Sequence, residues 1–270
     1  MPSLDQHVST TTTKLLMIGD SGAGKTSALA SLVEAGFKLR ILDFDNGLDA
    51  LVSQVRRRCP DKAKNVVFET LRDKYKGSGA GVVLDGAPRA FITAMQLLDK
   101  WGDLGKPSEW SSDTVVVIDT LTFLSQAAFN YAQFLNPSAK DKRAIFYTAQ
   151  ESIEHALSLL TGDAFKPNVI VIAHMIFLNR PDGTTKGFPI AVGQALSPKI
   201  APYFNSVALV ESSGSGQSIK RVMRTVSTPL IDLKNPASFE LAETLPIDQA
   251  LVTFFKTVQG NNNVVKLATK

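Results

Sequence analysis

Short apolar runs alternate with longer amphipathic segments along most of the chain. Several runs, such as residues 115–118, are almost wholly β-branched, which is typical of a central strand buried on both faces. Strands separated by helices favour an α/β fold around a mostly parallel sheet. The strands that this pattern predicts are residues 15–18, 39–42, 66–68, 115–118, 169–173, 207–210 and 219–226.

Helices are predicted where apolar residues recur every three or four positions. The last two strands are joined by a short Ser/Gly-rich segment, residues 212–217, and should form an antiparallel hairpin near the C-terminus. Residues 175–195 are rich in Pro and Gly and are predicted to be irregular and either functional or mobile, and residues 77–81 to be a flexible loop. The predicted helices are residues 26–34, 48–57, 88–101, 121–134 and 143–160.

Length and composition indicate one globular domain. The chain has 270 residues, 44% hydrophobic and 20% charged, with no internal shift in composition. We expect a domain over residues 14–258 between polar tails at 1–13 and 259–270. No apolar run approaches the ~20 residues of a membrane span, and the first residues lack the order of a signal peptide. A single cysteine, Cys59, excludes an internal disulfide, so we predict a cytoplasmic protein without a membrane partner.

The net charge of +4 permits contact with nucleic acid without requiring it. The cations form local groups, at residues 56–58, 72–76, 140–143 and 220–221. For any one group an ordinary solvated face is the favoured interpretation.

The strongest chemical signal is the octapeptide GDSGAGKT at residues 19–26, which follows a predicted strand and precedes a predicted helix. This is the pattern of a P-loop, in which glycines allow backbone N–H groups to converge on phosphates. Lys25 would reach the β- and γ-phosphates, and the Thr26 hydroxyl would bind Mg²⁺. The alternative is a glycine-rich turn before a surface helix. The predicted nucleotide-binding residues are Gly19, Asp20, Ser21, Gly22, Ala23, Gly24, Lys25, Thr26 and Ser27.

A second element of nucleotide chemistry is Asp119, which ends the apolar run 115–118. In a parallel sheet this position lies at the carboxyl edge, where ligands bind. Asp119 is therefore predicted to hold Mg²⁺ together with Thr26, in part through water. An N-cap for the helix that begins at residue 121 is a compatible alternative.

The second predicted strand, residues 39–42, is followed by Asp43-Phe44-Asp45. With this segment the chain resembles the RecA-like P-loop ATPases. In that family this strand ends in Asp, any residue, then Glu, and the glutamate polarises the attacking water. The resemblance implies that Asp45 is the general base, although aspartate is one methylene shorter than the usual glutamate. A turn chosen for backbone reasons is the alternative.

His174 ends the run 169–173. The resemblance implies that it senses the γ-phosphate and passes that information to the adjoining loop. The alternative is a structural histidine at the end of a buried strand. Lys25, Asp45, Asp119 and His174 are together the predicted catalytic residues.

The resemblance covers residues 15–234. Within the RecA-like class, the chain is similar to phage-encoded single-strand annealing or recombination ATPases. It implies a RecA-like core, a homo-oligomer, single-stranded DNA as a partner, and in some cases a single-strand DNA-binding protein. The family places a cation of one subunit at its neighbour's nucleotide, and the candidates here are Lys234, Arg221 and Arg224. The candidate DNA-contacting residues are Lys140, Lys142, Arg143, Arg180, Lys186 and Phe188, which can equally belong to mobile surface loops.

The predicted function is therefore a Mg²⁺-dependent ATPase acting on single-stranded DNA in phage recombination or annealing. Because no Asn-Lys-x-Asp guanine motif is present, ATP is favoured over GTP. One alternative is a nucleotide-gated module, such as a loader in phage replication or packaging, with little hydrolysis. A small-molecule kinase, with residues 175–195 as its lid, is the third hypothesis.

Overall fold

The structure is a computed structural model that describes residues 12–79, 81–138, 140–180 and 182–260. Its centre is a sheet of eight strands in the order β12-β11-β10-β1-β7-β6-β2-β3. The six strands from β10 to β3 run parallel, and β11 and β12 extend the β10 edge in antiparallel orientation. The strands are β1 (Lys14–Ile18), β2 (Lys38–Asp43), β3 (Val66–Thr70), β6 (Thr114–Asp119), β7 (Asn168–Ala173), β10 (Ser206–Ser213), β11 (Lys220–Arg224) and β12 (Thr244–Pro246).

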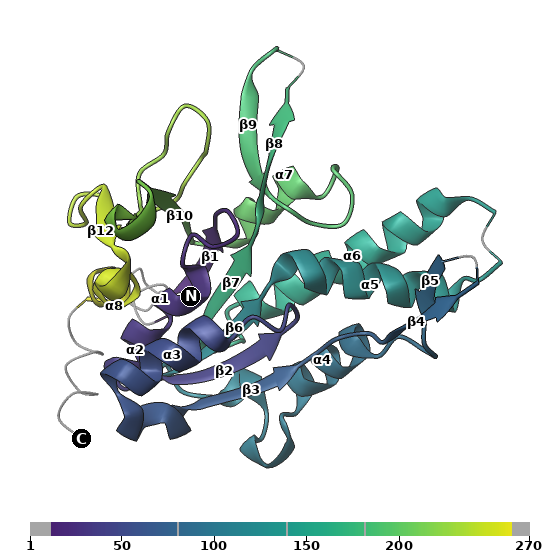
Figure 1. Ribbon diagram of the computed structural model, residues 1–270, viewed down its shortest axis with the longest axis horizontal. Helices are drawn as coiled ribbons and strands as arrows, with labels where there is room; N and C mark the ends of the chain where they lie inside the picture. Colours follow the sequence, from purple (N-terminus) through teal and green to yellow (C-terminus); the bar gives the residue numbers. More distant parts are fainter. Residues whose placement is uncertain (1–11, 80, 139, 181, 261–270) are drawn as a thin grey trace, which may run out of the picture.

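Helices cover both faces of the sheet, as Figure 1 shows. Alternate residues of each strand enter opposite cores; in β6, Val116 and Ile118 face one layer, and Val115 and Val117 face the other. The first layer contains α4 (Ala90–Asp99), α5 (Leu121–Leu135), α6 (Lys142–Thr161) and α7 (Ser197–Ile200). The second contains α1 (Lys25–Ala28), α2 (Ala30–Glu34), α3 (Asp49–Arg58) and α8 (Ile247–Val258). The predicted α/β fold with a C-terminal antiparallel hairpin is confirmed.

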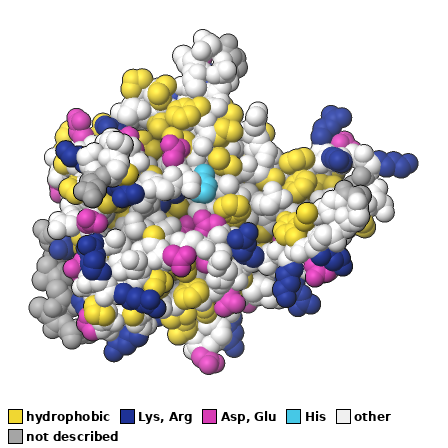
Figure 2. Space-filling model, viewed as in Figure 1, with side chains coloured by type: hydrophobic (Ala, Val, Ile, Leu, Met, Phe, Trp, Pro, Cys, Tyr) yellow, Lys and Arg dark blue, Asp and Glu magenta, His cyan; other side chains and the backbone are white. Residues whose placement is uncertain are grey.

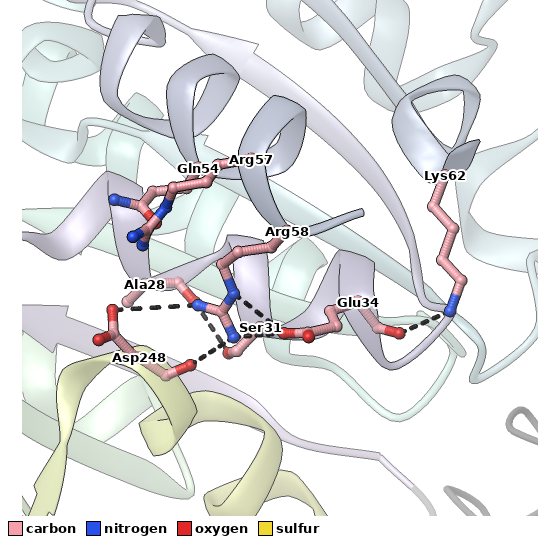
Figure 3. A network of polar contacts seen from close by, with 8 residues as sticks. All are labelled: Ala28, Ser31, Glu34, Gln54, Arg57, Arg58, Lys62 and Asp248. Atoms are coloured by element: carbon pink, nitrogen blue, oxygen red, sulfur yellow. Dashed lines mark hydrogen bonds and ion pairs between the residues drawn. The ribbon is translucent and has the colours of Figure 1, made fainter. Parts of the chain in front are cut away.

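Arg58 ties the second layer together (Figure 3). Its guanidinium donates to the Glu34 carboxylate of α2 and to the Asp248 carbonyl of α8. Lys62, in the 3₁₀ helix Pro60–Asn65, donates to the Glu34 carbonyl at 2.7 Å. The last member of the basic group 56–58 thus has a structural role that its sequence context did not reveal.

Two segments predicted to be irregular form antiparallel hairpins. Residues 175–195 contain β8 (Met175–Asn179) and β9 (Thr185–Pro189), and residues 77, 78 and 81 belong to the paired strands β4 (Tyr75–Ser78) and β5 (Gly81–Leu84). In Figure 1 the β8–β9 hairpin extends beyond the carboxyl end of β7, and β4–β5 lies beside the outer ends of α5 and α6. The prediction failed because glycines and prolines marked these segments as turns, while cross-strand pairing is not visible in local sequence.

Several smaller elements complete the chain. Helix α8 and strand β12 were not predicted, and the predicted helix 26–34 is interrupted at Leu29 between α1 and α2. Short 3₁₀ helices occur at Gly102–Leu104, Pro107–Glu109, Ala201–Tyr203 and Gly216–Ser218. No helix among the described residues has both the length and the apolar character needed to cross a bilayer. Of the predicted polar tails, residues 1–11 and 261–270 lie outside the described residues, as do Ala139 and Pro181 of the two candidate DNA loops.

Candidate active site

The predicted catalytic residues meet at the carboxyl edge of the parallel strands. A cavity of about 420 Å³ is lined there by the P-loop, by Asp45 after β2, by Asp119 at the end of β6 and by His174 after β7. These residues are far apart in the sequence and come together because all three strands point to the same edge.

The P-loop conformation depends on two of its glycines. A Cβ at Gly19 would lie 2.2 Å from the Val210 carbonyl oxygen of β10, so no side chain fits there. Gly24 precedes α1 with φ of 104°, in the left-handed region that glycine adopts without steric cost. The loop is therefore set by close backbone packing against the neighbouring strand.

Lys25 and Thr26 already contact groups of the site. The Lys25 ammonium is buried and donates to the Gly19 and Asp20 carbonyls, each at 2.8 Å. The Thr26 hydroxyl donates to Asp119 Oδ2 at 2.7 Å. Two oxygen ligands suited to Mg²⁺ thus lie side by side, and the other carboxylate oxygen, Oδ1 of Asp119, is buried without a hydrogen-bond partner in the described part of the chain.

Burial dominates the electrostatics of Asp119. The residue has no exposed surface, and burial raises its pKa to about 7, with the negative charges of Asp45 and Asp43 adding to the increase. The hydrogen bond from Thr26 and the charge of Lys25 act in the opposite direction. A cation at Oδ1 would favour the ionised form, so the donor set fits Mg²⁺. No group of three or more His, Cys, Asp or Glu side chains able to hold a metal occurs within residues 12–260 as far as they are described.

The two carboxylates of the Asp-Phe-Asp segment have different roles. Asp43 is buried and accepts from the Asn46 backbone N–H at 2.9 Å and from the Thr70 hydroxyl at 3.0 Å, so it builds the turn. Asp45 lines the cavity, and its Oδ1 has no hydrogen-bond partner among the residues described. Burial, and then the charge of Asp43, raises the pKa of Asp45. A carboxylate with a raised pKa and a free oxygen is suited to accept a proton.

Gly47 makes room for this carboxylate. A Cβ at Gly47 would lie 2.6 Å from Asp45 Oδ1. A side chain at position 47 would therefore displace the Asp45 carboxylate from this position.

His174 lies between the cavity and the β8–β9 hairpin. Burial, and then the nearby Lys25 charge, lowers its pKa, so the imidazole is neutral at pH 7. Its backbone N–H donates to the Thr122 hydroxyl at 3.2 Å, and this hydroxyl donates to the Ile190 carbonyl at 3.3 Å. The Ile190 N–H in turn donates to the His174 carbonyl at 2.8 Å. The pocket end of β7 is thus bonded to the foot of the hairpin.

Residues that sequence reasoning missed complete the cavity lining. Ala50, Ser53 and Gln54 lie on one side of α3 and line the cavity with Arg221 of β11. The spacing of three and four residues was visible in the sequence, but no motif marked it as a binding face.

The three cations predicted to reach a neighbouring subunit's nucleotide all contact residues of their own chain. The Arg221 Nε donates to the Gly22 carbonyl at 3.4 Å, so this side chain lies beside its own P-loop. Arg224 pairs with Glu211 at 2.8 Å, and the Lys234 ammonium donates to the Ala201 and Phe204 carbonyls at 3.1 and 3.2 Å. Each cation thus has a contact within its own chain, and its role toward a neighbouring subunit stays a prediction.

The candidate DNA residues fall into two groups. Arg180 and Lys186 of the β8–β9 hairpin both pair with Asp232, and Arg180 lies over the Phe188 ring at 5.9 Å. Lys140, Lys142 and Arg143 are exposed, and Arg143 pairs with its neighbour Asp141. The cations before and at the start of α6 are therefore more accessible than those of the hairpin.

Comparison with solved structures gives distant similarities that concern the fold alone. A KaiC-like protein of Pyrococcus horikoshii is 11% identical with a TM-score of 0.39, over 80% of this chain and 79% of that one. The RadB recombinase is 16% identical with a TM-score of 0.43, over 78% and 80%. An ATPase from the type III secretion system of pathogenic bacteria is 13% identical with a TM-score of 0.43, over 73% of this chain and 51% of that one.

Comparison by sequence identifies the family. No curated protein matches the chain. The profile of the AAA domain family matches residues 11–237, which include the P-loop, Asp45, Asp119 and His174. The chain therefore belongs to the AAA domain family of P-loop ATPases.

Proposed function

We propose that this protein is a Mg²⁺-dependent ATPase of RecA-like type. The observation that carries the proposal is the pair Asp45 and Asp119, each with a buried Oδ1 that has no hydrogen-bond partner among the described residues, in the cavity that Lys25 lines. An unsatisfied buried oxygen is costly to a folded protein, and a bound metal or reacting water accounts for it.

The residues of the P-loop would bind and neutralise the phosphates. Lys25 is held by two carbonyls on a flexible stem, so its ammonium can turn toward the β- and γ-phosphates. Thr26 and Asp119 are the residues that would hold Mg²⁺. The metal, when bound, neutralises charge on the transferred phosphoryl group.

Asp45 is the proposed base. Its raised pKa and its unpartnered Oδ1 suit it to orient a water and to accept the water's proton. The neutral His174 is the proposed γ-phosphate sensor, and the bonds through Thr122 to Ile190 support a mechanical link to the β8–β9 hairpin.

Two variants test the ATPase. Lys25→Ala is expected to remove nucleotide binding, because the phosphate cation is lost. Asp45→Asn is expected to keep binding and to lose at least ~100-fold in turnover, since an amide cannot accept the proton. Asp61→Asn, an exposed acid outside the cavity, is the matched control and should turn over like the wild type.

The outcomes separate the hypotheses. Unchanged turnover in Asp45→Asn would assign the base to another residue. A partner activity equal with ATP and with a non-hydrolysable analogue would favour the nucleotide-gated module over the ATPase.

We further propose that ATP turnover serves an activity on single-stranded DNA in a homo-oligomer, as in the phage recombination and annealing ATPases that the sequence resembles. The accessible cations Lys140, Lys142 and Arg143 support this proposal. Filter binding with ATP across a salt series tests it: affinity should fall as salt rises because bound cations release counterions. Absence of binding at low salt would refute the DNA part and leave the ATPase untouched.

A further inference from the structure

Helix α5 presents a line of residues that runs away from the active site. Phe123, Gln126, Asn130 and Phe134 follow one another at intervals of three and four residues, so they share one side of the helix. At the inner end the Phe123 ring meets the His174 ring edge-on, with centroids 6.1 Å apart. At a rise of ~1.5 Å per residue, the line reaches about 16 Å from Phe123 to Phe134.

The segment after β3 forms a facing wall. Arg72 donates to the Asp45 carbonyl at 3.2 Å, and the Tyr75 hydroxyl accepts from Asn130 at 2.8 Å. A cavity of about 150 Å³ lies between this segment and α5. We name this feature the α5 groove; its polar and aromatic lining is Phe44, Arg72, Asp73, Tyr75, Phe123, Gln126 and Asn130, and the Asp73 carboxylate accepts from Asn130 at 2.9 Å.

Exposed rings lie at the outer end of the α5 groove. Phe134 of α5 is 50% exposed, Tyr147 of α6 is 66% exposed, and Tyr75 of β4 is 53% exposed. Helices α5 and α6 are joined there by contact of the Phe129 and Phe146 rings at 4.7 Å. Three elements thus each carry an exposed ring, and Figure 1 shows β4 beside the outer ends of α5 and α6.

The excess positive charge of the protein is concentrated in the same region. Segments 72–89 and 140–143 contain seven Lys or Arg and three Asp, which equals the net +4 of the whole chain. The three acids are already engaged: Asp73 accepts from the Arg89 and Ala90 N–H groups, Asp85 pairs with Lys76, and Asp141 pairs with Arg143. Figure 2 shows Lys and Arg side chains gathered at this end of the molecule.

Accessible rings among cations are the combination that binds single-stranded nucleic acid, because bases stack on the rings and phosphates pair with the cations. We propose that the α5 groove and its outer end bind a single strand that leads toward the active site. This inference rests on the DNA activity proposed above, and it names the surface on which the DNA would bind. Arg72 contacts both the groove and the Asp45 backbone, so an occupied groove would influence the position of the base.

The test measures fluorescence anisotropy of a labelled thirty-residue oligothymidylate with wild type and variants at low salt. The double variant Phe134→Ala/Tyr147→Ala, and separately Lys140→Glu/Lys142→Glu, should each bind at least tenfold more weakly. Phe239→Ala and Lys256→Glu change an exposed ring and an exposed cation elsewhere and should bind within twofold of wild type. Unchanged ATP binding by each variant confirms that it is folded.

The results distinguish the two proposals. If both groove variants bind the oligothymidylate as tightly as wild type and Phe177→Ala on the β8–β9 hairpin binds more weakly, the groove is not the binding surface. The proposed DNA activity would then still stand. No binding by wild type would refute both the DNA activity and the groove. Competition by poly-glutamate as strong as that by unlabelled oligothymidylate would identify a site for acidic protein and overturn the inference. Loss confined to the groove variants supports it.

Discussion

Replacement of Asp119 by asparagine should make the protein more stable at neutral and alkaline pH while removing its activity. The carboxyl has no exposed surface, and burial raises its pKa from 3.8 to about 7. Each pKa unit corresponds to ~1.4 kcal/mol, so the shift of about three units amounts to about 4 kcal/mol. This is the cost of ionising Asp119 in the folded protein without a bound cation.

The sign follows from the direction of the shift. In the unfolded chain Asp119 loses its proton near pH 4, whereas in the folded protein it keeps the proton until about pH 7. Its contribution to stability is therefore complete below the unfolded pKa and is lost as the pH rises through the folded pKa. An asparagine does not titrate, so the free energy of unfolding of the variant relative to wild type should rise by about 4 kcal/mol between pH 4 and pH 8.

Urea denaturation of both proteins without nucleotide, at one-unit steps of pH, measures this difference. Comparison across pH removes any constant cost of the new amide. Asp113→Asn is the control of opposite sign: although burial acts to raise its pKa, hydrogen bonds from Ser111 and Lys38 prevail and the pKa of Asp113 is lowered. Its substitution should therefore destabilise the protein above pH 4. A pH-independent difference for Asp119→Asn would refute the reasoning.

Three further outcomes are expected. Gly47→Ala should lower turnover at least ~10-fold with ATP affinity within threefold, because its Cβ would lie 2.6 Å from Asp45 Oδ1; equal loss of binding and turnover in calorimetry and phosphate-release assays would contradict this role. Arg221→Ala should weaken ATP and inorganic tripolyphosphate by a similar factor of about tenfold, since Arg221 lies beside the P-loop that binds the phosphates; weakening of ATP alone would place Arg221 at the nucleoside. Binding of Mg·ATP at pH 6 should release a proton from Asp119, seen as a calorimetric enthalpy that depends on the buffer's ionisation enthalpy; identical enthalpies in two buffers would rule this out.

Much of the fold was readable from local sequence. Strand 115–118 and helix 143–160 were predicted to within one residue at each end of the observed β6 and α6. Both carry a strong local signal: the strand is a continuous apolar run, and the helix has apolar residues at helical spacing. The β4–β5 hairpin is largely exposed and the β8–β9 hairpin is mostly half-buried, and both were missed because their residues carry no such signal.

The sequence by itself determined the P-loop and the order of the strand ends that carry Asp45, Asp119 and His174, because these depend on residue type and on position relative to an apolar run. Only the tertiary structure decided which acid is free. The residue pattern alone does not say which of Asp43 and Asp45 is hydrogen-bonded; in the structure the Thr70 hydroxyl of a neighbouring strand donates to Asp43, whereas Asp45 Oδ1 has no partner among the described residues. Likewise, only strand pairing across the sheet brought Arg221 beside its own P-loop. The physical reason is that the partners of a buried polar group come from segments distant in the chain, and no local pattern specifies them.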